Sequence, residues 1–129
     1  MIVVDASALV AIAQREEERE AFLTILERTD IIYLSPINYV EAGMVLTQRG
    51  LFSGRDAFDG WLADLCVEQR DDLELGMAAL DAFVRYGKGR HPARLNLGDC
   101  FAYALAKTLD VPLLYKSDDF AKTDIRSAL

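Results

Sequence analysis

The chain has 129 residues, 52% of them hydrophobic, which fits a single domain, residues 1–129, with a sizeable buried core. Its formal net charge of −7, from 21 acidic and 14 basic residues, argues against a protein that coats nucleic acid by positive charge alone. Cys66 and Cys100 lack metal-binding spacing, so we expect no structural zinc. There is neither a basic leader nor an apolar run of roughly 18 residues, so we expect a cytoplasmic protein without a membrane span.

The first predicted element is a short buried strand. Residues 2–4 form an uninterrupted apolar run, which is typical of a central strand in a parallel sheet. Asp5 follows directly, and Ser7 then fits the N-cap of a helix that carries Leu9. Asp5 is therefore expected at the carboxyl end of a strand.

A second strand is predicted at residues 31–34, and Ser35 with Pro36 predicts the start of another helix. The apolar stripe expected to be buried in this helix comprises Ile37, Val40, Met44 and Val45. Glu41 falls on or beside that stripe, where a carboxylate needs a partner or a route to solvent. Two interpretations stay open: an edge glutamate that reaches water, or a member of a site.

The middle of the chain predicts two helices and a basic loop. One helix opens at Ser53 and runs to about residue 65, with a short extended piece near residues 66–69. Asp71 with Glu74 three residues later resembles a capping box, and the helix after it should end at Gly87. The inward positions of that helix are predicted to be Leu75, Leu80 and Val84.

The densest basic segment of the chain covers residues 88–94, and its glycine and proline content predicts an irregular, exposed loop. Such a loop is either an ordinary solvated connection or a contact for nucleic-acid phosphates. The candidate contacts are Lys88, Arg90, His91 and Arg94.

The next helix carries an acid in its first turn. Asn96 is a suitable N-cap, which places Asp99 at the third helical position. The face predicted to be buried consists of Leu97, Phe101, Leu105 and Leu109, and alanines at 102, 104 and 106 allow neighbours to approach closely. Asp99 either stabilises the helix through its dipole or acts in a site.

The last strand is predicted at residues 111–115, and Asp118 and Asp119 follow it. The order of strands and helices predicts an α/β fold with a mostly parallel central sheet and helices on both faces. Strand carboxyl ends and helix amino ends then share one edge of the sheet. Acids from four distant segments should meet there: Asp5, Glu41, Asp99, and Asp118 or Asp119.

Clustered carboxylates repel one another unless a cation lies between them, and all-oxygen ligation favours Mg²⁺ or Mn²⁺. A metal-activated water attacking a phosphodiester is the reaction that such a site suits.

Four segments in this order resemble PIN-domain ribonucleases, specifically the VapC toxins of bacterial VapBC toxin–antitoxin systems: VVDAS, SPINYVEAG, YGKGRHPARLNLGDCFAYALAK and LLYKSDDFAKTDI. The resemblance implies a three-layer sandwich and a Mg²⁺- or Mn²⁺-dependent endoribonuclease that cuts tRNA or ribosomal RNA. It also implies a homodimer, a VapB antitoxin and a higher toxin–antitoxin assembly. The family's acids correspond to Asp5, Glu41, Asp99 and Asp119, and the resemblance implies that Asp5 and Asp99 bind the metal ion.

Two departures from the family pattern leave Asp118 and Asp119 as alternatives for the fourth acid. Ser117 stands where the family usually has glycine, and Asn38 stands where a small hydroxyl residue is commoner. The alternatives to a ribonuclease are a phosphatase and an inert partner-binding domain. A phosphatase with Asp5 as nucleophile usually needs a second acid two residues later, where this chain has Ser7, and an inert partner-binding domain has no need of all four acids.

Overall fold

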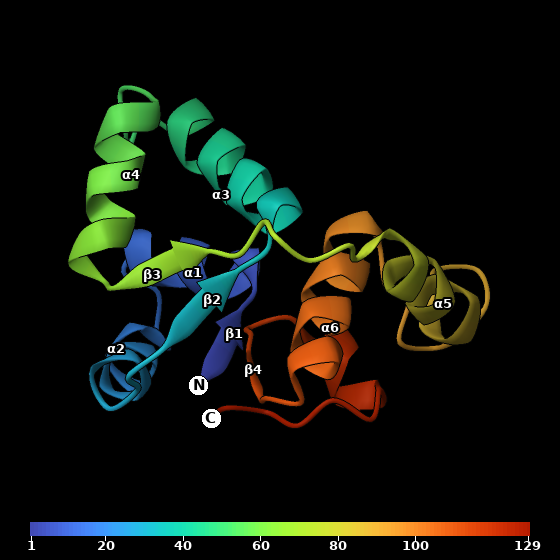
Figure 1. Ribbon diagram of the computed structural model, residues 1–129. Helices are drawn as coiled ribbons and strands as arrows, with labels where there is room; N and C mark the ends of the chain where they lie inside the picture. Colours follow the sequence, from blue (N-terminus) through green and yellow to red (C-terminus); the bar gives the residue numbers. More distant parts are fainter.

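The computed structural model describes all residues, Met1–Leu129, and is organised around a four-stranded sheet (Figure 1). The strands are β1 (Ile2–Val4), β2 (Ile32–Leu34), β3 (Val67–Gln69) and β4 (Leu113–Leu114). Their order across the sheet is β3-β2-β1-β4, and every pairing is parallel. The first strand of the chain therefore lies inside the sheet, between β2 and β4.

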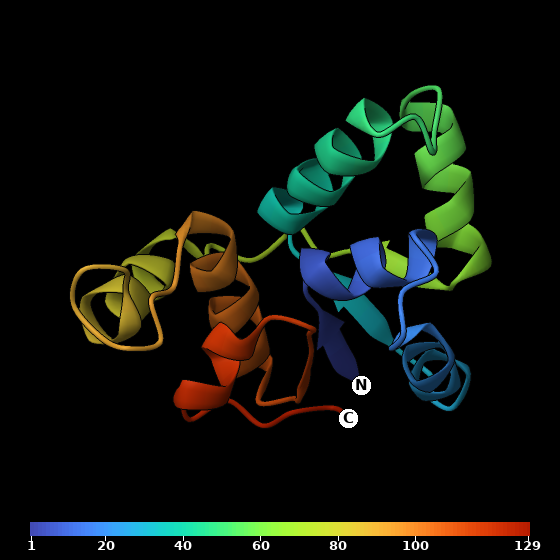
Figure 2. The ribbon, with the colours of Figure 1, turned by 180° about the vertical axis from the view of Figure 1, so that it is seen from behind.

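Helices cover both faces of the sheet (Figures 1 and 2). They are α1 (Ala6–Ala13), α2 (Arg19–Glu27), α3 (Pro36–Gln48), α4 (Arg55–Asp64), α5 (Gly76–Tyr86) and α6 (Leu97–Leu109), followed by the 3₁₀ helix η1 (Asp118–Lys122). Helices α1 to α4 share one core with the sheet, and α5 and α6 share the other. The predicted three-layer α/β sandwich is confirmed. None of these helices combines the length and the apolar character that a membrane crossing requires.

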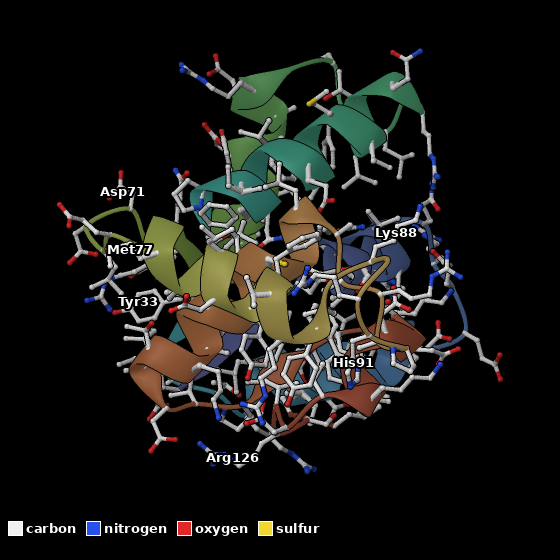
Figure 3. The ribbon with its side chains drawn as sticks, turned by 90° about the vertical axis from the view of Figure 1, so that its right-hand side faces the viewer. Tyr33, Asp71, Met77, Lys88, His91 and Arg126 are labelled. Carbon is white, nitrogen blue, oxygen red and sulfur yellow. The ribbon has the colours of Figure 1, made fainter.

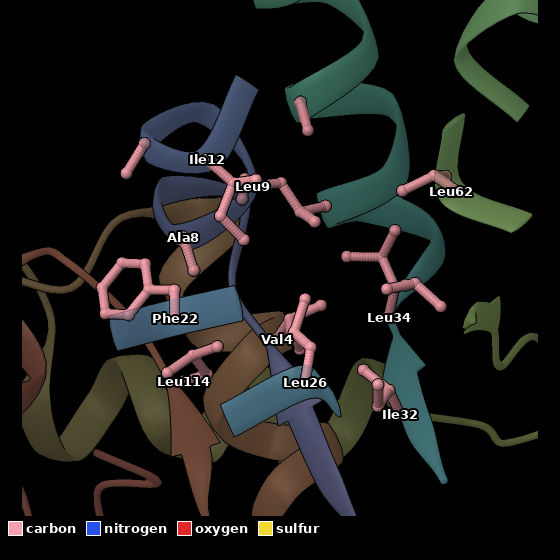
Figure 4. Packing of buried hydrophobic residues seen from close by; sticks show 14 of the residues in the cluster. Val4, Ala8, Leu9, Ile12, Phe22, Leu26, Ile32, Leu34, Leu62 and Leu114 are labelled. Atoms are coloured by element: carbon pink, nitrogen blue, oxygen red, sulfur yellow. The ribbon is translucent and has the colours of Figure 1, made fainter. Parts of the chain in front are cut away.

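The sheet side chains alternate between the two cores because successive residues of a strand point to opposite faces. In β1, Ile2 and Val4 contact the α1 to α4 layer, whereas Val3 contacts the α5 and α6 layer. In β4, Leu114 and Leu113 divide in the same way. Figure 4 shows Val4 and Leu114 among side chains of α1 and α2. Burial on both faces explains why β1 is apolar throughout.

Several helices present a different face to the core than their apolar spacing predicts. Met44, Leu80 and Leu97, expected inside, are 68%, 63% and 69% exposed. The buried positions of α5 and α6 are largely alanines: Ala79, Ala82, Ala102, Ala104 and Ala106. Small side chains let helices pack closely, so the alanine-rich faces are buried and Leu80 and Leu97 stay outside, whereas Leu105 is fully buried as expected. Val40 and Val84 are likewise exposed.

Three helix starts also differ from the prediction. Helix α1 is capped by Asp5, whose Oδ2 accepts a hydrogen bond from the backbone N–H of Ser7 at 3.0 Å. The capping box expected at residues 71–74 does not form, since α5 begins at Gly76 after Leu75 without a side-chain cap. Helix α4 begins at Arg55, two residues after the predicted start.

Candidate active site

An acidic cavity of about 450 Å³ lies where the carboxyl end of β1 meets the amino-terminal parts of α3 and α6. Asp5 follows β1, Glu41 lies in the second turn of α3, and Asp99 lies in the first turn of α6. Asp119, in η1 after β4, lines the same cavity, and so does Glu16. The parallel topology thus gathers the acids of four distant segments, as the sequence predicts.

Asp5 is almost completely buried, with 3% of its surface exposed. Its Oδ2 is occupied in capping α1, while its Oδ1 is buried and has no hydrogen-bond partner. Burial, together with smaller contributions from the negative charges of Asp99 and Glu41, raises the pKa of Asp5 to about 7. An unpartnered buried carboxylate oxygen is costly, which indicates a group that is completed by a bound cation.

Asp99 is fixed by a reciprocal capping box. Its backbone N–H donates to Asn96 Oδ1 at 2.9 Å, and its Oδ2 accepts from the Asn96 backbone N–H at 3.1 Å. Burial, together with smaller contributions from the charges of Asp119 and Glu41, raises the pKa of Asp99 to about 6. Because the Asp99 charge also acts on Asp5, Asp99 is the acid that interacts with each of the other three.

Glu41 is held against the amino end of α6 by a contact that requires glycine. A methyl group on Gly98 would lie 2.6 Å from both carboxylate oxygens of Glu41. The buried Asn38 amide donates to the Gly98 carbonyl at 3.0 Å and lies 3.4 Å from Glu41 Oε1, and the Ser35 hydroxyl donates to Asn38 Oδ1 at 2.5 Å. In the sequence, Asn38 stands out only as a departure from the pattern of related segments, and no local signal indicates Gly98.

The two neighbouring acids after β4 face different ways. Asp119 is half-buried and lines the cavity, whereas Asp118 is exposed and does not. The buried Phe120 anchors this turn, and the Asp119 backbone N–H donates to Ser117 Oγ at 3.3 Å. This geometry favours Asp119 as the fourth acid of the cavity.

The basic loop, residues 88–94, in which Figure 3 labels Lys88 and His91, surrounds a separate cavity of about 530 Å³ that no acid lines. Arg90 Nε donates to the Val84 carbonyl at 3.0 Å, while Lys88 and Arg94 are exposed. His91 Nδ1 accepts from a backbone N–H at 3.0 Å, and its ring lies edge-on to Tyr86. None of the four candidate contacts lines the acidic cavity, and their role in RNA binding stays a prediction.

The donors of the cavity fit a hard divalent cation. The candidate ligands are carboxylate, hydroxyl and amide oxygens, no histidine or cysteine lines the cavity, and the buried Asp5 Oδ1 lacks a partner. No group of three or more His, Cys, Asp or Glu side chains could by itself hold a metal ion in this arrangement. Mg²⁺ commonly uses one or two carboxylates and completes its shell with water and substrate phosphate, which suits Asp5 and Asp99 as its protein ligands.

The fold and the acidic cavity together define a known class of protein. The family model described as PIN domain matches residues 2–126, and the chain belongs to that family. Within it, the chain is similar along nearly its whole length to VapC ribonucleases, and it is a ribonuclease of this group.

VapC ribonuclease Mb0640 of Mycobacterium bovis is 41% identical over 128 residues, covering 96% of this chain and 95% of the relative. Ribonuclease VapC42 of Mycobacterium tuberculosis is 39% identical over 129 residues, covering 98% of each chain. The crystal structure of Mycobacterium tuberculosis VapC20, described as a sarcin-ricin loop cleaving toxin, has a TM-score of 0.71 at 16% identity and covers 97% of this chain and 96% of that one. This last similarity supports the fold.

The raised pKa values of Asp5 and Asp99 predict how stability depends on pH without metal. Their pKa values are about 7 and about 6 instead of 3.8, so the folded protein retains protons that the unfolded chain releases as the pH rises. The stability that Asp5 contributes is thus full below about pH 4 and is lost as the pH rises through 7. In EDTA, we expect the free energy of unfolding to fall by about 2–4 kcal/mol over this range relative to Asp5→Asn. Denaturant unfolding at a series of pH values measures this difference, and parallel curves for the two proteins would contradict it.

Proposed function

We propose that this ribonuclease is a Mg²⁺- or Mn²⁺-dependent endoribonuclease toxin that cuts structured cellular RNA, tRNA or rRNA, and is neutralised by a VapB-type antitoxin. The observation that carries the proposal is the meeting of Asp5, Glu41, Asp99 and Asp119 in one cavity. The similarity to VapC ribonucleases supports it as well.

The residues of the cavity take different parts in the proposed reaction. Asp5 and Asp99 bind the cation, Asp5 through the oxygen that α1 leaves free and Asp99 from a helix terminus fixed by Asn96. Glu41 and Asp119 complete the acidic wall and orient the attacking water. When bound, the cation supplies positive charge to the scissile phosphate and acidifies that water.

The proposal is tested by incubating the purified protein with total cellular RNA in Mg²⁺, in Mn²⁺ and in EDTA. Sequencing the RNA 5′ ends after brief induction of the protein in its host then identifies the cut. We expect a few discrete sites in tRNA or rRNA, cut only with a divalent cation. Metal-independent cutting, or no cutting of any RNA, would contradict the proposal. A phosphatase would instead be revealed by a phosphoaspartate at Asp5, and an inert domain by binding without cleavage.

The two neighbouring acids should differ in activity. Asp119→Asn is expected to lower RNA cleavage about tenfold or more, because Asp119 lines the cavity, whereas Asp118→Asn should change it less than twofold because Asp118 is exposed. Cleavage rates of the two purified variants at saturating Mg²⁺ provide the measurement. The reverse ranking would indicate that the turn after β4 is shifted in the active protein.

A second, larger cavity fits the proposed antitoxin. It has a volume of about 740 Å³ and lies between α3 and α4, with Val40, Met44 and Phe58 in its lining. Val45 and Arg49 line both this groove and the acidic cavity, so the two lie next to each other. An amphipathic segment of the antitoxin that binds in the groove therefore has a direct path to the carboxylates.

An arginine in the tail of the antitoxin is the expected inhibitory group, because its planar fork binds carboxylates in pairs and competes with Mg²⁺ for Asp5 and Asp99. Replacing arginines of the tail with alanine should leave tight binding to the groove and restore cleavage. Binding and activity measurements on the complex with the antitoxin encoded beside this chain test the prediction. Unchanged inhibition would mean that the antitoxin acts by covering the site.

The exposed apolar side chains of α5 and α6 form another surface, which we assign to a second copy of the chain. Met77, Leu80 and Val84 of α5 are exposed there beside Leu97 of α6 (Figure 3 labels Met77). Burying such a patch in a symmetric pair is the common route to a homodimer. Pairs of such dimers joined by antitoxins would give the higher assembly.

A further inference from the structure

The acidic cavity is lined by two basic side chains as well as by carboxylates. Arg49, at the carboxyl end of α3, and Lys116, after β4, both contribute to its wall. RNA that approaches clustered carboxylates on a chain of net charge −7 needs positive charge close to the point of cleavage. These two side chains are therefore the first candidates for contacts with RNA phosphates.

The two cations differ in whether they are neutralised. Lys116 Nζ forms ion pairs with Glu16 and with Glu18, the latter at 3.5 Å. Arg49 forms no ion pair with any carboxylate of the chain. Arg49 is thus the cation of the cavity wall whose charge is free to act on an incoming anion.

A neutral side chain fixes the orientation of Arg49. Its Nη1 donates to the Gln14 Oε1 at 2.7 Å, and Gln14 also lines the acidic cavity. The amide uses one of the five guanidinium N–H donors and does not cancel the charge. The remaining donors suit the bidentate binding of a phosphate.

We infer that Arg49, oriented by Gln14, binds a backbone phosphate of the RNA beside the one that is cut. This inference rests on the proposed function, and it identifies Arg49 as a residue that positions the RNA substrate. It also assigns the phosphate contact to a side chain of the acidic cavity, whereas the basic loop at residues 88–94 lines a cavity of its own.

Arg28 provides a matched control because it resembles Arg49 in exposure, in its position at a helix end and in its lack of an ion pair. Both arginines are exposed and both are the C-cap residue of a helix, α2 for Arg28 and α3 for Arg49. Arg28 forms no ion pair and does not line the cavity. Replacing either one with glutamine removes the same charge and the same interaction with a helix dipole.

The test measures binding of a fluorescein-labelled RNA hairpin, by anisotropy in Mg²⁺, to protein in which Asp99→Asn slows cleavage. Arg49→Gln should weaken binding about fivefold and reduce the slope of log K against log[KCl] by about 0.7–0.9, the value for one lost phosphate contact. Arg28→Gln should leave both quantities unchanged, and Arg49→Lys should restore the slope with weaker binding. In the cleaving protein, Arg49→Gln should raise KM about fivefold with kcat within about twofold.

Equal slopes for Arg49→Gln and Arg28→Gln would overturn the inference while leaving the nuclease assignment intact. Weaker binding of the antitoxin with unchanged RNA binding would overturn it too, and would assign Arg49 to the groove between α3 and α4. Absence of RNA cleavage by the unchanged protein would instead remove the proposed function, and the subsite with it.

Discussion

Replacement of Asp99 by asparagine is expected to lower RNA cleavage by about 10²–10³-fold while the protein stays folded. Asp99 is the acid that interacts electrostatically with Asp5, Glu41 and Asp119, and it is a proposed cation ligand. The neutral amide has nearly the same shape but binds a divalent cation far more weakly. Single-turnover cleavage at saturating Mg²⁺ measures the loss, and a rate within twofold of the unchanged protein would contradict the assignment.

The same substitution should stabilise the protein when metal is absent. An asparagine oxygen can still accept from the Asn96 backbone N–H, so the helix start is preserved. The pKa of the Asp99 carboxyl group is raised to about 6, so at neutral pH its charge is unfavourably buried and repelled by its neighbours. Removing this charge should raise the free energy of unfolding by about 1–2 kcal/mol at neutral pH in EDTA. Lower activity combined with higher stability would distinguish the loss of a functional charge from a folding defect.

Gly98→Ala is expected to lower cleavage by about 10–100-fold, although it adds only a methyl group. That methyl group would lie 2.6 Å from both oxygens of Glu41, so the carboxylate must leave its place beside Asp99. Gly60→Ala in α4 is the matched control, because nothing lies within 4 Å of its added carbon and the helix should gain stability. Cleavage rates and unfolding curves of both variants provide the test.

A double-mutant cycle shows whether the effect of Gly98 acts through Glu41. In a Glu41→Ala protein the methyl group at position 98 has no carboxylate to displace, so adding Gly98→Ala should cost little further activity. Fully multiplicative losses would mean that the methyl group disturbs α6 itself. A Gly98→Ala protein with normal activity would show that the position of Glu41 is unimportant.

The layer order and the place of the acids could be predicted because both follow from short-range patterns. An apolar run followed by Asp5, and an Asn96 cap three residues before Asp99, position these two acids without knowledge of distant contacts. Parallel strands then bring both acids to one edge of the sheet. The metal and the roles of the four acids are proposals that rest on this geometry.

The helix faces and the support of Glu41 could not be predicted in the same way. Apolar spacing cannot tell a core-facing stripe from a partner-facing one, and Met44, Leu80 and Leu97 are exposed for that reason. The contact of Asn38 with Gly98 joins residues that are 60 positions apart, and only the packing of α3 against α6 brings them together. The same holds for Arg49 and Gln14, which are 35 positions apart.

The most direct test of the metal site is the calorimetric titration of the protein with Mn²⁺ in buffers of different ionisation enthalpy. Metal binding must displace the protons held by Asp5 and Asp99, whose pKa values are about 7 and about 6. We predict release of about one proton per protein near pH 6.5, falling towards zero at about pH 8, and no such release from the Asp5→Asn/Asp99→Asn double variant. Mn²⁺ binding that releases no protons at any pH, or that persists unchanged in the double variant, would contradict a metal site built from these two acids.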